Sequence, residues 1–124
     1  MGKFVVFTSE NGMRFHLRAG NGETIATSEV YTTMASCRSG MESIRKCAPK
    51  AKLEDLLGEK KTAVSNPKFQ IFLDKGGAYR FRLRARNGQV IASSQPYTSR
   101  DACLTGIDSV RVNALDAIVE FEEE

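Results

Sequence analysis

The sequence predicts an α+β fold built from two β-β-β-α-β repeats, and three observations lead to this prediction. First, the segment RFHLRAGNG at 14–22 returns 66 positions later as RFRLRARNG at 80–88, which indicates two copies of one unit. Second, apolar and charged residues alternate along both segments, as is typical of a strand with one buried face. Third, the apolar residues that follow each segment have helical spacing.

The chain of 124 residues is predicted to form a single domain, 1–124, with internal pseudo-twofold symmetry. A unit of about 60 residues is close to the size at which one core is only marginally stable, so the copies are expected to share a core. We place repeat one at 3–57, a connector at 58–67 and repeat two at 68–121. Because each copy supplies the partner of the other, we expect a monomer that acts as an internal pseudo-dimer.

Each repeat should begin with three antiparallel strands. The first is rich in Phe, Val and Ile, and the second alternates strictly, so that one face is apolar and the other basic. Asn21-Gly22 and Asn87-Gly88 then predict type I′ turns, in which both residues have positive φ. The expected strands are 3–8, 13–19 and 23–28 in repeat one, and 68–73, 79–85 and 89–94 in repeat two.

A helix and a short last strand complete each repeat. The apolar positions after each Tyr-Thr pair recur at three and four residues, which predicts helices packed on the same face of one sheet. Gly40 and Gly106 lie within these stripes, where a close approach would offset the roughly 1 kcal/mol that a helical glycine costs. Thr98, three residues before Asp101, predicts a helix N-cap. We expect the helices near 32–47 and 98–113, and the last strands at 52–56 and 117–121.

The composition narrows the class of protein. The formal charge is +3, but the arginines concentrate in one strand of each repeat while the last residues, 120–124, are mostly acidic. No long apolar run follows the start, so we expect neither a secretory signal nor a membrane span. Three cysteines without CxxC spacing favour a reducing compartment and predict a cytoplasmic location. No pair of cysteines, or cysteine with histidine, has ligand spacing, so we predict no metal site.

The combined motif resembles a known family. It consists of a Phe-rich strand, a glycine turn, Arg and Leu in alternation, Asn-Gly, Ile-Ala-x-Ser, Tyr-Thr, and a helix that carries Gly and Ser, and both copies contain it. It is similar to the YegP-like proteins of bacteria, whose repeat is a domain of unknown function. The resemblance implies one antiparallel sheet with exchanged C-terminal strands and two helices on one face, and it implies that single-repeat relatives dimerise. It implies no activity, catalytic residue or cofactor.

The second strands supply the best candidate for a binding surface. Their outward side chains are basic in both repeats, and two phenylalanines of the first strands have the same outward parity. Basic groups interleaved with aromatic rings suit an anionic backbone with stacked bases. The alternative is a solvated face, on which arginine stems cover the rings and charge discourages aggregation. The candidate polyanion-binding residues are Arg14, His16, Arg18, Arg80, Arg82, Arg84, Arg86, Phe7 and Phe72.

The sequence contains no recognisable catalytic constellation. His16 is the only histidine, but its counterpart in repeat two is Arg82, and no motif places a carboxylate or nucleophile beside it. Cys37 and Cys103 fall on the helical stripes and are expected in the core, whereas Cys47 should lie nearer the surface. We therefore predict a non-enzymatic binding or interaction module, without a cofactor, whose partner is a polyanion or another protein.

Overall fold

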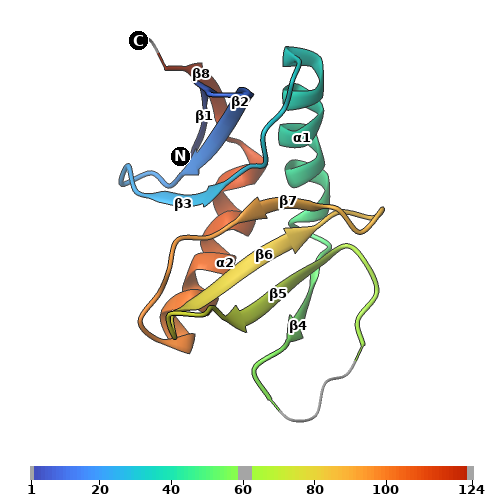
Figure 1. Cartoon of the computed structure of the whole chain (residues 1–124), viewed down its shortest axis with the longest axis vertical. Coiled ribbons are helices and arrows are strands. Elements are labelled where there is room, and N and C mark those ends of the chain that lie inside the picture. Colours follow the sequence, from blue (N-terminus) through green and yellow to red (C-terminus); the bar gives the residue numbers. More distant parts are fainter. Residues whose placement is uncertain (1, 59–62, 123–124) are drawn as a thin grey trace.

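The computed structural model describes residues 2–58 and 63–122, which form one eight-stranded sheet and two helices (Figure 1). Repeat one contributes β1 (Lys3–Ser9), β2 (Gly12–Arg18), β3 (Thr24–Thr27), α1 (Met34–Cys47) and β4 (Lys52–Asp55). Repeat two contributes β5 (Lys68–Leu73), β6 (Tyr79–Arg84), β7 (Val90–Ser93), α2 (Arg100–Leu115) and β8 (Ile118–Phe121). The predicted α+β class and the order of elements in each copy are confirmed.

The last strands of the two repeats are exchanged. The strand order is β4-β5-β6-β7-β3-β2-β1-β8, so β4 lies beside β5 of repeat two and β8 lies beside β1 of repeat one. The six inner strands are antiparallel, but both outer pairs are parallel, which corrects the expectation of a purely antiparallel sheet. The chain continues from α1 into β4 without reversing its direction (Figure 1). β4 therefore enters the other half of the sheet, where it pairs with β5 in parallel.

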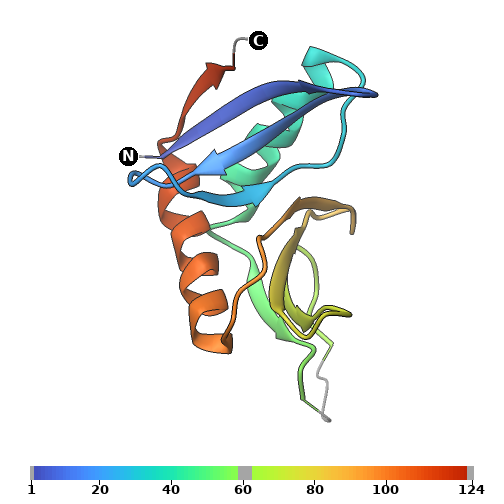
Figure 2. The ribbon, with the colours of Figure 1, turned by 60° about the vertical axis from the view of Figure 1, so that its left-hand side comes forward.

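The two halves of the sheet meet at a narrow junction. Within the described residues, β3 and β7 pair only through Thr27 and Ser93, and the halves meet there at an angle (Figure 2). The helices bridge this junction, because α1 contacts β2 and β7 while α2 contacts β6, β2 and β3. They enclose one core, in which the largest fully buried side chains are Phe4, Phe15, Phe69 and Phe81.

The predicted type I′ turns are wrong in their geometry. Gly22 and Gly88 have positive φ, at 88° and 85°, but neither asparagine does. Ala19 accepts a hydrogen bond from the N–H of Gly22 and donates one to the carbonyl of Glu23, and repeat two has the same pattern. This is a three-residue hairpin with a G1 bulge, in which the glycine alone takes the left-handed conformation.

The N-cap of α2 also differs from the prediction. Ser99, rather than Thr98, has the extended backbone of a cap residue, and its side chain accepts a hydrogen bond from the N–H of Ala102. Thr33 makes the equivalent bond to Ser36 in α1. Both candidate residues in repeat two carry a hydroxyl, so the residue type alone could not separate them.

Candidate functional site

The face of the sheet opposite the helices, here called the outer face, carries the arginine rows. The rows lie on β6 and β2, and β7 and β3 separate them. The strand register aligns one residue from each strand in a line across this face. Each of the two arginine rows contributes one residue to this line. From β4 to β8 these residues are Glu54, Gln70, Arg82, Ser93, Thr27, His16, Val5 and Glu120.

Hydrogen bonds to Gln70 order the arginines of β6. Its Oε1 accepts a hydrogen bond from the Nε of Arg82 and another from the Nε of Arg84, both at 2.7 Å. Arg84 also donates from Nη1 to the carbonyl of Gly88 at 2.7 Å. The amide nitrogen of Gln70 donates to Glu54. Two guanidinium groups are therefore ordered by contacts within the protein, and an anion bound to them would cost less side-chain entropy than one bound to free side chains.

Glu54 partly neutralises this cluster. The residue is 7 % exposed, and its Oε2 accepts hydrogen bonds from Lys68 Nζ and from the N–H of Val64, both at 3.1 Å. The hydrogen bond from Gln70 is the main cause that lowers the pKa of Glu54 to about 2, although burial acts in the opposite direction. One carboxylate is thus ionised among the cations Lys68, Arg82 and Arg84, so the cluster keeps a net positive charge at neutral pH.

Arg80 and Arg14 bring the two rows together at the junction. Arg80 pairs with Asp74 at 2.7 Å and donates to the carbonyl of Ser94 at 3.3 Å. Its counterpart Arg14 donates to the carbonyl of Ser28 at 3.0 Å. A depression of about 240 Å³ lies between them, and its other lining residues are Thr27, Ser28, Glu29, Ser93, Ser94 and Gln95.

The two outward phenylalanines are partly covered by basic side chains. The imidazole of His16 stacks on Phe7 with ring centroids 4.4 Å apart and 19° between planes. The guanidinium of Arg82 lies 4.6 Å from the ring centroid of Phe72, a favourable cation–π distance. One side of each ring is therefore occupied, and a nucleic-acid base would meet the imidazole or guanidinium plane there.

His16 is an uncharged member of the outer face at neutral pH. Burial is the main cause that lowers the pKa of its imidazole, and the charges of Arg18 and Arg14 act in the same direction while Glu122 opposes them. Its Nδ1 lies 3.0 Å from the hydroxyl of Thr27. This contact and the Phe7 stack hold the ring in the sheet surface. In repeat two, burial and the charge of Arg84 lower the pKa of Arg82, which stays protonated.

Arg86 lies outside this surface. β6 ends at Arg84, Ala85 is buried, and Arg86 is exposed at a separate pocket that Cys47 also lines. Cys47 is 8 % exposed, whereas Cys37 and Cys103 are fully buried, so Cys47 lies nearer the surface than the other two cysteines, as expected, although it is still buried. It follows Ile44 by three residues and therefore belongs to the same buried stripe of α1.

The described residues offer no evident catalytic centre. Burial raises the pKa of Cys37, and it raises that of Cys103 to about 11, so both thiols stay protonated at neutral pH. In the part of the chain that the structure describes, no three His, Cys, Asp or Glu side chains gather in a way that could hold a metal ion. Neither described helix is long and apolar enough to cross a membrane.

The exchanged strands and the shared core define the chain as a tandem-repeat α+β protein with pseudo-twofold symmetry. Residues 9–55 and 74–120 each match the family described as "Domain of unknown function (DUF1508)". The chain belongs to this family, which confirms the resemblance noted in the sequence.

Relatives of two lengths are similar to this chain. The UPF0339 protein YegP of Escherichia coli O6:H1 is 44% identical over 113 residues, which cover 91% of this chain and 89% of that protein. A UPF0339 protein of Methanosarcina acetivorans is 62% identical over 50 residues, which cover 40% of this chain and 86% of that protein. The second relative therefore has about the length of one repeat.

Solved structures share the fold. The solution NMR structure of yegP from E. coli, described as a protein of unknown function, has a TM-score of 0.79 and 34% identity, and the match covers 98% of this chain and 92% of that one. The solution NMR structure of a UPF0339 protein from Shewanella oneidensis has a TM-score of 0.78 and 30% identity, with coverage of 97% and 90%. These relatives and structures carry no named activity.

Proposed function

We propose that this protein is a non-enzymatic binding module of the bacterial cytoplasm that holds a nucleic-acid backbone on its outer face. The distribution of charge carries the proposal. Five arginines share this face, whereas its strand carboxylates, Glu54 and Glu120, lie on the edge strands β4 and β8. The arginines are Arg14, Arg18, Arg80, Arg82 and Arg84.

The geometry of the rows supports an extended anionic ligand. Alternate residues of a strand are about 6.6 Å apart, so each row presents charges at a regular short interval. Guanidinium groups form charge-assisted, forked hydrogen bonds with phosphate oxygens, which favours Arg over Lys at such a surface. Arg82 and Arg84 use Nε for Gln70, and the terminal nitrogens of Arg82 make no hydrogen bond to other described residues.

A protein partner is the second candidate, and the edge strand β8 favours it. Its side chains Ile118, Val119 and Phe121 are 50%, 41% and 53% exposed, and the strand has a neighbour on one side, β1. A strand from another protein could add to this edge through backbone hydrogen bonds. Such binding would depend little on salt, because it uses few charges.

The nucleic-acid proposal is tested by fluorescence anisotropy with labelled single-stranded and double-stranded oligonucleotides. The parent should bind, and its affinity should fall at least about tenfold between roughly 50 and 200 mM salt, because several phosphates are contacted. The variant with Arg80→Ser, Arg82→Ser and Arg84→Ser, here called the face variant, should lose this binding. A second variant, with Arg14→Gln and Arg18→Gln, tests the row of the other repeat.

A matched control carries the same change in net charge elsewhere. The variant with Lys46→Ser, Lys50→Ser and Arg86→Ser, here called the pocket variant, removes three exposed cations away from the outer face. It should keep most of the affinity for oligonucleotides. Equal loss in the two variants would contradict the assignment to the outer face. A parent protein without measurable affinity at low salt would overturn the proposal, and the solvated-face interpretation would then hold.

A further inference from the structure

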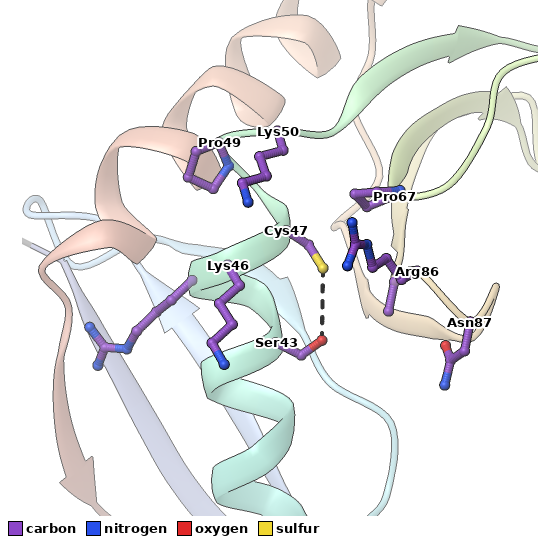
Figure 3. Close-up of a pocket in the computed structure, with 10 residues that line it drawn as sticks. Ser43, Lys46, Cys47, Pro49, Lys50, Pro67, Arg86 and Asn87 are labelled. Atoms are coloured by element: carbon purple, nitrogen blue, oxygen red, sulfur yellow. Dashed lines mark hydrogen bonds between the residues drawn. The ribbon is translucent and has the colours of Figure 1, made fainter.

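We propose that a pocket on the helical side of the molecule binds a small amphipathic anion, a ligand distinct from the polymer proposed for the outer face. The pocket has a volume of about 640 Å³ and lies between the C-terminal end of α1 and the β6–β7 turn. In Figure 3, Ser43 and Cys47 of α1 face the turn residues Arg86 and Asn87. A volume of this size lies within the usual range of small-molecule sites.

The pocket combines apolar walls with a positive charge. The side chains of Cys47, Pro49, Pro67 and Ala85 supply uncharged surface, and none of the ten lining residues carries a carboxylate. Of these ten residues, Arg45, Lys46, Lys50 and Arg86 are cationic.

One of the four cationic side chains already makes hydrogen bonds within the protein. Arg45 donates hydrogen bonds to the carbonyls of Leu115 and Ala117 at the end of α2. Lys46, Lys50 and Arg86 are exposed, and their charged ends form no ion pair or hydrogen bond with other described residues. Three cations are therefore left for a ligand at the mouth of the pocket.

The pseudo-twofold symmetry provides an internal comparison. Ser43, Arg45, Ala85 and Asn87 have identical counterparts in the other half, and these residues therefore belong to the shared scaffold. Lys46, Lys50 and Arg86 have no cationic counterpart in the other half. The equivalent residues there are Val112, Asp116 and Gly20. Since the other half forms the same fold without a cation at any of these three positions, the fold does not require the cations.

In the other half, the backbone fills the space that is equivalent to this pocket. Gly2 precedes β1 at the position that Pro67 holds before β5, and a Cβ on Gly2 would lie 2.7 Å from the Cβ of Asn113, the counterpart of Cys47. The backbone thus packs directly on α2 there. The pocket is therefore open and lined by three cations that pair with no other described residue in one half, whereas the backbone fills the equivalent space in the other half. This difference points to a ligand with an aromatic or acyl body, which contacts the apolar walls, and one anionic head group, which the cations bind.

The test uses two dyes that differ by one charge. The probe is 1-anilinonaphthalene-8-sulfonate, and its control is N-phenyl-1-naphthylamine, which has the same rings without the sulfonate. The parent should bind the sulfonate saturably with one dye per chain, and the pocket variant should bind it at least about tenfold more weakly, because charge-assisted contacts are lost. The face variant should bind it like the parent. The uncharged dye should bind parent and pocket variant with equal affinity.

Any other pattern of dye binding contradicts the proposal. Unsaturable binding by the parent, equal affinity of parent and pocket variant for the sulfonate, or a loss confined to the face variant would overturn it. The melting temperature of the pocket variant should match that of the parent, because the three side chains are exposed. If the two melting temperatures differ, the single variant Arg86→Gly replaces the pocket variant in the dye-binding test, since Gly20 occupies the equivalent position in the other half. The proposal is independent of oligonucleotide binding, so either result can fail alone.

Discussion

At the scale of single residues, the helical glycines are explained by the tyrosines that precede each helix. A Cβ on Gly40 would lie 2.6 Å from Cζ of Tyr31 and even closer to its hydroxyl, and a Cβ on Gly106 would lie 2.8 Å from Cζ of Tyr97. Tyr31 cannot retreat easily, because its ring stacks on Phe15 at 6.1 Å and its backbone pairs with Met13. The close approach inferred from the sequence is therefore made by a tyrosine ring.

Gly40→Ala is expected to destabilise the protein by about 1–2 kcal/mol, although alanine is the better helix former, because overpacking outweighs the gain of up to about 1 kcal/mol in helix propensity. Urea unfolding measures the change. In a Tyr31→Ala background the same substitution should instead stabilise, since the obstructing ring is gone. A destabilisation of equal size in both backgrounds would show that the tyrosine is not the cause.

His16 should make folding stability depend on pH. Its pKa is lower in the folded protein than its ordinary value of 6.5, so the unfolded chain takes up the proton first as the pH falls. The parent should therefore lose stability as the pH falls below about 6.5, and His16→Gln should lose less over the same change in pH. Parallel curves of unfolding free energy against pH for the two proteins would contradict this.

Glu54 acts in a separate pH interval. Its pKa is lowered from 4.5 to about 2, so its contribution to stability is complete above 4.5 and is lost as the pH falls towards 2. Thermal unfolding of parent and Glu54→Gln at pH 6 and pH 3 checks this. The difference in stability between the two proteins should shrink at the lower pH, and a constant difference would count against the assignment.

At the scale of elements, two counterpart arginines tie the ends of the helices together. Arg111 of α2 donates to the carbonyl of Ala48 at 2.7 Å, while Arg45 of α1 donates to the carbonyl of Leu115 at 3.3 Å. Each guanidinium also lies over a core phenylalanine of its own repeat, at 4.8 Å for Arg111 and 5.2 Å for Arg45. Each arginine therefore satisfies carbonyl groups that the partner helix leaves unpaired at its end.

Arg111→Ala should destabilise the protein by about 1–3 kcal/mol, because a hydrogen bond from a charged group and a cation–π contact are lost together. Arg111→Lys should restore only part of this, since an ammonium lacks the flat guanidinium plane. Chemical denaturation provides the values, with Arg38→Ala on the exposed side of α1 as the control that should change little. Full recovery by lysine would mean that charge alone matters.

The sequence predicts where the strands and helices lie along the chain better than it predicts which of them pair in the sheet. Periodicity of two and of three to four located the strands and helices, and parity placed both arginine rows on one face. The exchange of strands came from the family resemblance, because no local pattern encodes which half β4 will join. For the same reason the contact between Glu54 and Gln70 could not be predicted. Arg86 does not follow the parity of the row, because β6 ends at Arg84 and the chain then enters the turn.

At the scale of the whole molecule, the exchanged strands make each repeat dependent on a second copy. In the full chain that copy is covalently attached, so light scattering in dilute reducing solution should give the mass of one chain. A repeat expressed alone would leave its first strand without the parallel neighbour that β4 or β8 supplies. The Methanosarcina relative has about the length of one repeat, and for a chain of that length we predict that two copies associate.

Repeat two alone, residues 64–124, is therefore expected to form a symmetric dimer in which β8 of each copy pairs with β5 of the other. Glu120 occupies the position in repeat two that Glu54 holds in repeat one, so in this dimer it would face Gln70 and Lys68 as Glu54 does in the full chain. Light scattering should give twice the mass of the fragment. Glu120→Ala should weaken the dimer, because Gln70 and Lys68 lose their buried carboxylate partner. A folded monomer, or a dimer that is unaffected by this substitution, would contradict the exchange.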